Sequence, residues 1–285
     1  MTNFNSLNIA LIGAGGKMGQ IMISLIGQHP DINLVAAIEH PEFKELGNSV
    51  HIQSNHPSEL VFESIQNLDL LLSNNQIDVC VDFSHPESTT KWAPIFLRRK
   101  IPIVIATTGL SEHFINNIQE VAKLTQTSLL ISTNMAFGMN IFIKMAKEIA
   151  KFIPNWDIEI IEKHHHHKLD SPSGTALTIA NEIKEVVAKD FKSDDMFTFG
   201  RGKGRFPRKF GNKEIGIHAV RAGDIVGEHT VIFAGAGERI EFTHQAQSRN
   251  SFAEGALNAA RFLTKVRNQG RLFNISDVIE YAKGS

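Results

Sequence analysis

The residues most able to do chemistry stand in one stretch, Glu162 to Ala176, which holds four histidines, a lysine and a helix start. The histidines are His164 to His167, and Lys168 follows them directly. Ser173 is a typical N-cap residue, so the backbone N–H groups of Gly174 to Ala176 should begin a helix and lie open. A helix N-terminus binds anions through its amides and its dipole. Because histidine and lysine can exchange protons with a bound acid, the stretch predicts an anion site with proton-transfer groups.

Two other interpretations of the histidine run stay open. Histidines can ligate a metal, but alternate residues of a strand face opposite sides, so His164 would converge only with His166, and His165 only with His167. No cysteine is nearby, and the neighbouring carboxylates fit no standard ligand spacing. We therefore expect no metal site. The run could also be a solvated polar loop without chemistry.

The whole-chain composition fits a soluble enzyme of one or two domains. The chain has 285 residues, 42% of them hydrophobic, and a net charge of −1. This balance argues against nucleic-acid binding and against a polybasic membrane contact, and no apolar run reaches membrane-spanning length. The single cysteine, Cys80, favours a reducing compartment because no internal disulfide can form. The N-terminus leads into a predicted strand rather than a signal peptide.

A second candidate site lies near the N-terminus. The glycine-rich turn Gly13 to Gly19 follows an apolar strand, Leu7 to Ile12, and precedes a predicted helix. Glycines permit the tight turn and the close approach of a pyrophosphate, although Met18 stands where the common fingerprint has its third glycine. Glu39 ends the next strand, where a carboxylate can accept hydrogen bonds from ribose hydroxyls. The pattern predicts a dinucleotide site, with a plain flavodoxin-like turn as the alternative.

Strands and helices alternate through the first half of the chain, which predicts an α/β domain with a Rossmann-like, doubly wound parallel sheet. In such sheets ligands bind beyond the carboxyl ends of the strands. Two later strands end in the polar segments Thr107 to Gly109 and Thr133 to Asn134. These segments are candidates to line the nicotinamide, with ordinary loop chemistry as the alternative.

The pattern changes after Asn140, where a helix with Ile141, Met145 and Ile149 on one face is predicted. The strand before the histidine run and the helix after it come next. A basic, glycine-rich loop covers residues 199–213. Strands over 215–221, 228–233 and 239–244 and helices over 252–266 and 276–282 complete the prediction. We expect an α+β domain with a mostly open sheet, and its uncovered face or edge favours an oligomer.

Three stretches resemble the dihydrodipicolinate reductase (4-hydroxy-tetrahydrodipicolinate reductase) family of bacterial lysine and diaminopimelate biosynthesis. They are Gly13 to Gly19, Val220 to Thr230, and Glu162 to Ala176, which is similar to the family signature E-x-H-H-x-x-K-x-D-A-P-S-G-T-A. The resemblance covers essentially the full length. It implies NAD(P)H-dependent reduction of 4-hydroxy-tetrahydrodipicolinate to tetrahydrodipicolinate by a cytoplasmic homotetramer. It also implies a dinucleotide-binding domain over 1–134 and 246–285, and a substrate-binding and oligomerisation domain over 135–245.

The resemblance also implies roles for single residues. His164 would be a proton donor or acceptor, Lys168 a proton donor, and His165 a substrate contact. The substrate carboxylate would be held by Ser173, Gly174 and Thr175. The cofactor contacts would be Gly13, Ala14, Gly15, Gly16, Lys17, Met18, Glu39, Ala106, Thr107, Thr108, Ser132, Thr133, Asn134 and Met135.

Three positions depart from the family pattern. Ser171 replaces an alanine, and Asn134-Met135-Ala136 stands where Asn-Phe-Ser is common, so an aromatic neighbour of the nicotinamide would be missing. His40 stands where many members carry Arg or Lys. Glu39 repels a 2′-phosphate, and a neutral histidine compensates less than Arg, although Lys17 could restore some affinity. We expect use of both NADH and NADPH, with NADH at least as good.

The implied chemistry starts from a cyclic imine dicarboxylate held by the amides of Gly174 and Thr175. NAD(P)H would deliver a hydride, and Lys168 or His164 would stabilise or protonate the developing charge after the domains close. Two rival classes remain. A non-catalytic nucleotide sensor would not need His164 and Lys168, and a histidine-liganded metal hydrolase would need a metal.

Overall fold

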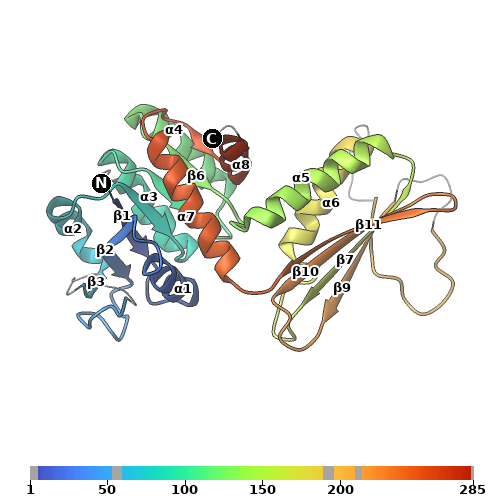
Figure 1. Ribbon diagram of the computed structural model, residues 1–285, viewed down its shortest axis with the longest axis horizontal. Helices are drawn as coiled ribbons and strands as arrows, with labels where there is room; N and C mark the ends of the chain where they lie inside the picture. Colours follow the sequence, from blue (N-terminus) through green and yellow to red (C-terminus); the bar gives the residue numbers. More distant parts are fainter. Residues whose placement is uncertain (1–5, 53–59, 189–195, 209–213, 284–285) are drawn as a thin grey trace. The chain divides into compact units, whose positions relative to one another are not determined.

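The computed structural model describes residues 6–52, 60–188, 196–208 and 214–283. The chain splits into two compact units (Figure 1). Unit 1 comprises Met1–Phe137 and Arg249–Ser285, and unit 2 comprises Gly138–Ser248. The chain therefore leaves unit 1, builds unit 2 and returns. No helix within the described ranges is long and apolar enough to cross a membrane.

Unit 1 is built on a seven-stranded sheet in the order β12-β6-β5-β4-β1-β2-β3, with every neighbouring pair parallel. Its strands are β1 (Leu7–Ile12), β2 (Ile32–Glu39), β3 (Phe62–Ser64), β4 (Val79–Asp82), β5 (Ile103–Ile105), β6 (Leu129–Ile131) and β12 (Leu272–Phe273). Its helices are α1 (Lys17–Ile26), α2 (Leu68–Asn74), α3 (Pro86–Arg98), α4 (Glu112–Thr125), α7 (Asn250–Lys265) and α8 (Ile275–Lys283), with a short 3-10 helix at Ile65–Asn67. This sheet confirms the predicted Rossmann-like fold, whereas β3, α2 and β12 were not predicted.

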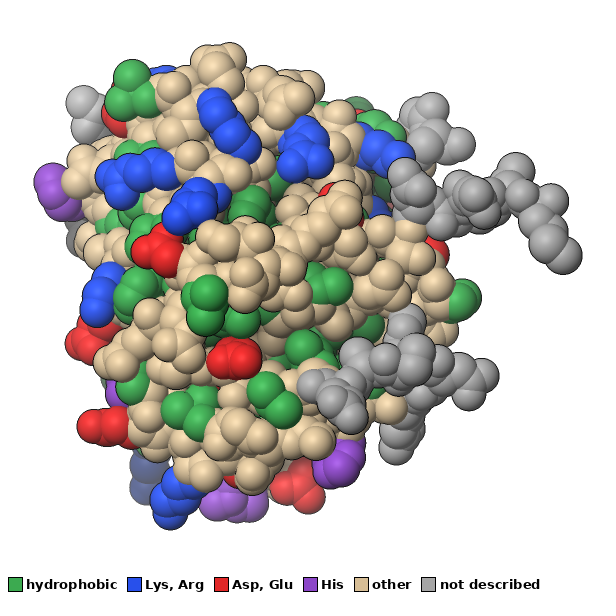
Figure 2. Space-filling view, turned by 90° about the vertical axis from the view of Figure 1, so that its left-hand side faces the viewer, with side chains coloured by type: hydrophobic (Ala, Val, Ile, Leu, Met, Phe, Trp, Pro, Cys, Tyr) green, Lys and Arg blue, Asp and Glu red, His purple; other side chains and the backbone are tan. Residues whose placement is uncertain are grey.

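Helices cover both faces of this sheet. In β1, Ile9 and Leu11 join the core formed with α1, α7 and α8, whereas Ala10 and Ile12 join the core formed with α2, α3 and α4. Successive strand residues face opposite sides, so a sheet covered twice needs nearly continuous apolar strands. Helix α7, drawn orange-red in Figure 1, packs against α1 although unit 2 separates them in the sequence. Figure 2 shows one face of the molecule, where hydrophobic side chains lie scattered among polar ones, as on most protein surfaces.

Unit 2 contains a mixed five-stranded sheet in the order β11-β10-β7-β9-β8. Its strands are β7 (Asp157–His164), β8 (Phe197–Phe199), β9 (Ile215–Arg221), β10 (Gly227–Ala234) and β11 (Arg239–Ala246), and its helices are α5 (Phe137–Phe152) and α6 (Gly174–Val187). Along β7, Ile158 and Ile160 are buried, whereas Glu159 and Ile161 are half-exposed. The predicted α+β domain with a mostly open sheet is confirmed, and β8 was not predicted. Strands β10 and β11 pair antiparallel as a hairpin. The predicted basic loop is described only in part, because residues 209–213 lie outside the described ranges.

The predicted helix after Asn140 is α5, and its buried face is not the one that carries Ile141 and Met145. Ile141 and Met145 are 40% and 45% exposed, whereas the buried side chains are Met139, Phe142, Ala146 and Ala150. The Phe142 ring stacks on Phe242 of β11 with the ring centroids 4.5 Å apart. Helix α5 carries apolar residues on two faces, and the packing against the sheet decides which one is buried.

Candidate functional site

The glycine turn connects β1 to α1 at the carboxyl end of the sheet. Gly13 has a φ of +78°, and a Cβ there would lie 2.8 Å from the carbonyl oxygen of Phe83. A Cβ on Gly19 would lie only 2.1 Å from the carbonyl oxygen of Gly13. Gly16 is the N-cap of α1 and provides no side-chain cap. The turn is therefore built for close backbone packing, and its helix start offers main-chain donors to an anion.

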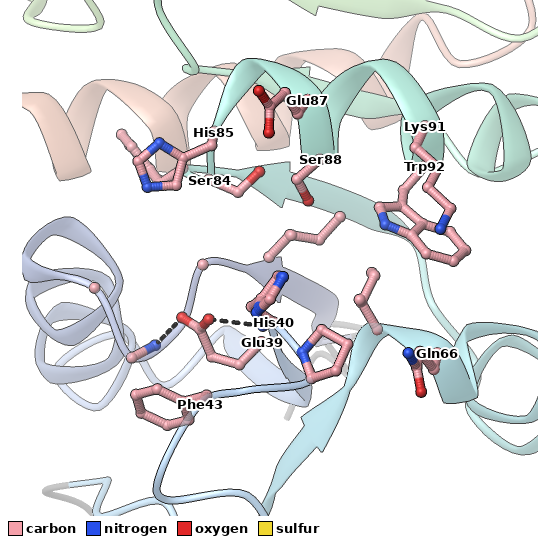
Figure 3. A pocket seen from close by; sticks show the side chains of 17 residues that line it. Glu39, His40, Phe43, Gln66, Ser84, His85, Glu87, Ser88, Lys91 and Trp92 are labelled. Atoms are coloured by element: carbon pink, nitrogen blue, oxygen red, sulfur yellow. Dashed lines mark hydrogen bonds between the residues drawn. The ribbon is translucent and has the colours of Figure 1, made fainter.

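Glu39 reaches from the end of β2 to this turn. Its Oε1 accepts a hydrogen bond from the Gly15 N–H at 2.7 Å, and its Oε2 accepts one from the His40 N–H at 2.9 Å (Figure 3). The Phe43 ring lies against Gly15, where an added Cβ would be 2.3 Å from the ring. The structure thus brings the predicted acidic residue to the predicted turn.

A pocket of about 760 Å³ opens beside the turn, a size typical of cofactor sites. Four predicted contacts line it: Gly13, Gly15, Gly16 and Glu39. The pocket also has lining residues that were not predicted from the sequence, among them Phe43, Gln66, Ser84, His85, Ser88, Lys91 and Trp92. Figure 3 shows Phe43 toward one end of the pocket and Gln66, Lys91 and Trp92 toward the other. For Ser84, His85 and the residues of α3, the only signal in the sequence was their position after a strand of the parallel sheet. Ser84 and His85 closely follow β4, and α3 begins at Pro86.

Asp82, buried at the end of β4, organises the neighbouring strand ends. Its carboxylate accepts hydrogen bonds from the Thr89 hydroxyl at 2.7 Å, the Thr107 hydroxyl at 3.3 Å and the Ser84 N–H at 2.8 Å. Burial raises the pKa of Asp82, although these hydrogen bonds oppose the increase. The Thr107 hydroxyl, predicted to contact the cofactor, is thus directed into the protein.

The remaining predicted cofactor contacts do not line this pocket. They are Ala14, Lys17, Met18, Ala106, Thr107, Thr108, Ser132, Thr133, Asn134 and Met135. Ser132 and Asn134 form a turn after β6, in which the Ser132 hydroxyl donates to the Asn134 carbonyl at 2.9 Å. Met135 is only 2% exposed and belongs to the apolar core. Lys17 is exposed at the start of α1.

In unit 2 the histidine turn joins β7 to α6, as predicted. The strand ends at His164, so the expected alternation of side chains through His167 is wrong. The chain leaves the sheet because other groups take its backbone hydrogen bonds: the Ala222 N–H donates to the His164 carbonyl at 2.9 Å, and the His166 N–H donates to the Gly223 carbonyl at 3.1 Å. Among the described residues, no group of three or more His, Cys, Asp or Glu side chains is arranged to hold a metal ion.

Glu162, fully buried on β7, joins the parts of this turn. Its Oε2 lies 2.6 Å from Nδ1 of His164, and its Oε1 accepts the Ser173 N–H at 3.0 Å. Arg221, on the neighbouring strand β9, donates to both oxygens at 2.8 Å each. Burial alone would raise the pKa of Glu162, but hydrogen bonds from His164, Arg221 and Ser173 lower it to about 2. The carboxylate is therefore ionised at neutral pH.

The other side of His164 faces β10. A Cβ on Gly227 would lie 3.1 Å from Nε2 of His164, so only glycine leaves this nitrogen ordinary room. The His164 ring meets His229 edge-on with the centroids 5.3 Å apart. His229 is 3% exposed, and its Nε2 lies 3.2 Å from the Ser173 hydroxyl oxygen. Burial, followed by the electrostatic interaction with His164, lowers the pKa of His229 to about 3, so its ring is neutral at neutral pH.

The start of α6 is partly closed and partly open. The Ser173 hydroxyl accepts the Ala176 N–H at 3.2 Å, so this amide is not open as predicted, because the cap uses it. Gly174 is exposed, and a Cβ there would meet nothing within 4 Å. Lys168 Nζ lies 2.8 Å from Oδ1 of Asp170. This contact, with the backbone of Gly174 contributing a further hydrogen bond, lowers the pKa of Asp170.

Three residues that complete this network had no predicted role: Arg221, Gly227 and His229. Each lies in the motif Val220 to Thr230, which was quoted only as a resemblance. The structure brings them to His164 because β9 and β10 are the two neighbours of β7. Their signal was the motif itself, but no local pattern connected it with the histidine run.

Comparisons with known proteins agree with this picture. Family models described as the N-terminus and the C-terminus of dihydrodipicolinate reductase match residues 7–135 and 138–279. The chain is 38% identical over 274 residues to the 4-hydroxy-tetrahydrodipicolinate reductase of Methanosarcina barkeri, covering 96% of this chain and 99% of that protein. The Burkholderia mallei protein of the same name is 38% identical over 276 residues, which cover 96% of this chain and 98% of that protein.

A solved structure shares the fold. The dipicolinate-bound dihydrodipicolinate reductase from Paenisporosarcina sp. TG-14 matches with a TM-score of 0.73 and 24% identity, over 94% of this chain and 97% of that one. The resemblance seen in the three sequence motifs is therefore confirmed at the level of whole-chain similarity. The chain belongs to the dihydrodipicolinate reductase family.

Proposed function

We propose that this chain reduces 4-hydroxy-tetrahydrodipicolinate to tetrahydrodipicolinate with NADH or NADPH, in lysine and diaminopimelate biosynthesis. Its relatives are named for this reductase activity. The observation that carries the proposal is the start of α6, where carboxylate-binding donors stand beside Lys168 and the His164–Glu162 pair. A dinucleotide-type turn in unit 1 supports the use of a nicotinamide cofactor.

Unit 1 is assigned to the cofactor, which supplies the hydride when bound. The turn and the start of α1 suit a pyrophosphate, because the glycines leave room and the helix start supplies N–H donors. Glu39 suits the ribose hydroxyls, and the pocket between Phe43 and Trp92 suits the remaining adenosine. The segments after β5 and β6 are assigned to the nicotinamide side because they follow neighbouring parallel strands.

Unit 2 is assigned to the substrate. A carboxylate already occupies the start of α6: Asp170 accepts hydrogen bonds from Lys168 and from the backbone of Gly174. A substrate carboxylate can replace Asp170 on these donors, with the Thr175 amide as a further donor. His165 is assigned as a substrate contact, and His164 and Lys168 are assigned to proton transfer. The relative titled as dipicolinate-bound supports a ring dicarboxylate as the ligand class.

Both cofactors are assigned, with NADH at least as good as NADPH. Glu39 places a negative charge where a 2′-phosphate would lie. His40 compensates little, because its Nδ1 accepts a hydrogen bond from the Glu42 N–H at 3.2 Å, which requires the neutral ring. Lys91 lines the pocket whereas Lys17 does not, so Lys91 is the better candidate to attract the phosphate.

We also propose a cytoplasmic homotetramer assembled through unit 2. One side of its sheet carries half-buried residues that no helix of the described part of unit 2 covers, and β11 is an exposed edge strand. Such a face and edge favour assembly with further copies. The single cysteine, Cys80, is a free, buried thiol, which suits a reducing compartment.

The direct test follows oxidation of NADH and NADPH by the full chain with freshly generated 4-hydroxy-tetrahydrodipicolinate. We expect turnover that requires both substrates. Binding of the nucleotide without turnover would support the sensor class instead. A stoichiometric metal ion in the purified protein, without nicotinamide oxidation, would support the metal hydrolase class.

A further inference from the structure

We propose that Glu162 is a positioning residue that orients His164 for proton transfer and ties it to the carboxylate-binding start of α6. The role of His164 rests on the proposed function, whereas the geometry of Glu162 does not. Glu162 is fully buried on β7 and touches three groups from different parts of unit 2. These contacts assign a separate task to each oxygen of its carboxylate.

The first task concerns the proton on His164. Glu162 Oε2 lies 2.6 Å from Nδ1 of His164. An ionised carboxylate only accepts hydrogen bonds, so Nδ1 must carry a hydrogen. The neutral ring is then the Nδ1–H tautomer, and Nε2 is the nitrogen that gains and loses a proton. A carboxylate behind a histidine has this effect in many enzyme sites, because it fixes both tautomer and ring direction.

The second task concerns the anion site. Glu162 Oε1 accepts the Ser173 N–H at 3.0 Å, and the Ser173 hydroxyl in turn accepts the Ala176 N–H. One rigid carboxylate therefore holds both the proton-transfer residue and the N-cap of α6. Their relative position is set by a single side chain rather than by the long turn between them.

Arg221 stabilises the buried carboxylate of Glu162. A buried carboxylate without a cation is costly, and Arg221 donates to both oxygens of Glu162 in the bidentate geometry that suits these groups. Arg221 also donates to the Asp170 carbonyl at 2.6 Å, so it holds the turn as well. A purely structural ion pair would need only Arg221 and Glu162. The additional contact with His164 is what predicts an effect on chemistry.

The first experiment reads the tautomer of His164 in the full chain labelled with 15N-histidine. A long-range 1H–15N spectrum distinguishes Nδ1–H from Nε2–H, and the signal missing in His164→Gln identifies the residue. We expect the Nδ1–H form in the wild type and its loss in Glu162→Gln. A wild-type His164 ring with a hydrogen on Nε2 and none on Nδ1 would overturn the proposal. This measurement stands even if Glu162→Gln fails to fold. Because it needs no turnover, it also separates this proposal from the proposed reaction.

The second experiment compares kinetics in matched variants. For Glu162→Gln we expect turnover to fall about 100-fold, the loss typical of general acid–base help, with a higher substrate KM and an unchanged NADH Kd. Arg221→Gln breaks the same ion pair but should keep the Nδ1–H signal of His164. Glu182→Gln removes a different carboxylate of α6, which is paired with Lys147 of α5, and should keep wild-type turnover. Wild-type turnover and tautomer in Glu162→Gln would overturn the positioning role.

Discussion

The two candidate sites share a backbone arrangement but differ in the side chains around it. Each is a strand-to-helix turn in which a carboxylate accepts a hydrogen bond from a turn amide: Glu39 from Gly15, and Glu162 from Ser173. Glu39 accepts its two hydrogen bonds from the backbone N–H groups of Gly15 and His40, and no side chain caps α1. Around Glu162 the partners are His164 and Arg221 as well, and Ser173 caps α6 with its hydroxyl.

This difference separates the functions of the two turns. The glycine turn depends on empty space, because a Cβ on Gly13, Gly15 or Gly19 would collide with neighbouring atoms. The histidine turn depends on charge and on the placement of protons. Added volume should therefore damage the first site, and loss of a donor or a charge should damage the second.

The largest expected effect is that of Lys168→Ala in the histidine turn. Loss of a proton donor should lower kcat by about 10²–10⁴-fold. The NADH Kd should stay near the wild-type value, because Lys168 lies in unit 2. Steady-state kinetics and NADH fluorescence titration measure the two quantities, with Lys184→Ala on α6 as the control that keeps turnover. An equal loss of cofactor affinity and rate would contradict the division between the sites.

Gly19→Ala tests the glycine turn by adding volume. The new Cβ would lie 2.1 Å from the Gly13 carbonyl oxygen, so we expect the free energy of unfolding to fall by about 1–3 kcal/mol and NADH binding to weaken. Gly16→Ala is the matched control for stability alone, because its Cβ would lie 3.3 Å from the same oxygen. Urea unfolding and titrations with NADH and dipicolinate measure the effects. A similar loss of dipicolinate affinity in unit 2 would speak against independent sites.

Thr175→Val should raise the substrate KM about tenfold and change kcat less, because one hydrogen bond to a charged group is lost. The contact should hold the carboxylate in both the ground state and the transition state, which is uniform binding. Initial rates across substrate concentrations separate the two constants. An unchanged KM would show that the start of α6 does not bind the substrate carboxylate.

Mild acid should weaken unit 2 through His229. Its pKa is about 3 in the folded chain and near 6.5 when unfolded, so the unfolded form binds the extra proton between these values. The stability from the neutral ring is complete above pH 6.5 and is lost as pH falls, on the order of 1 kcal/mol per pH unit. Asp82 in unit 1 acts in the opposite direction, because its raised pKa favours the folded form in acid.

The measurement uses the two tryptophans, one in each unit. In a Trp92→Phe background, Trp156 fluorescence reports urea unfolding of unit 2 at pH 6.5 and pH 5.5. His229→Gln should lose part of the pH dependence. An identical pH dependence with and without His229 would contradict its assignment.

The smallest expected effect concerns cofactor choice. At pH 8 we expect kcat/KM for NADH to equal or exceed that for NADPH, because Glu39 places a negative charge where a 2′-phosphate would lie. Lys91→Ala should lower kcat/KM for NADPH more than for NADH, whereas Lys17→Ala should alter the ratio less. A strong NADPH preference that persists at pH 8 would contradict the reasoning from Glu39 and His40.

The sequence alone determined both turns and the fold class. Glycine spacing, the Ser173 cap and the alternation of strands with helices are local patterns, which the backbone geometry of each segment translates directly into structure. For the same reason the position of Glu39 at the end of its strand was predictable. The motif from Val220 to Thr230 was visible too, but only as a resemblance.

The tertiary structure decided how the side chains are combined. Arg221 meets Glu162 across 59 residues of sequence because β9 pairs with β7, and His229 faces Glu162 through the register of β10. Strand order also brought Lys91 and Trp92 into the same pocket as Glu39 and directed the Thr107 hydroxyl toward Asp82. Packing against the sheet selected the buried face of α5. Local periodicity defines each element and its two faces. Which faces and strand ends come together depends on the packing of the whole chain.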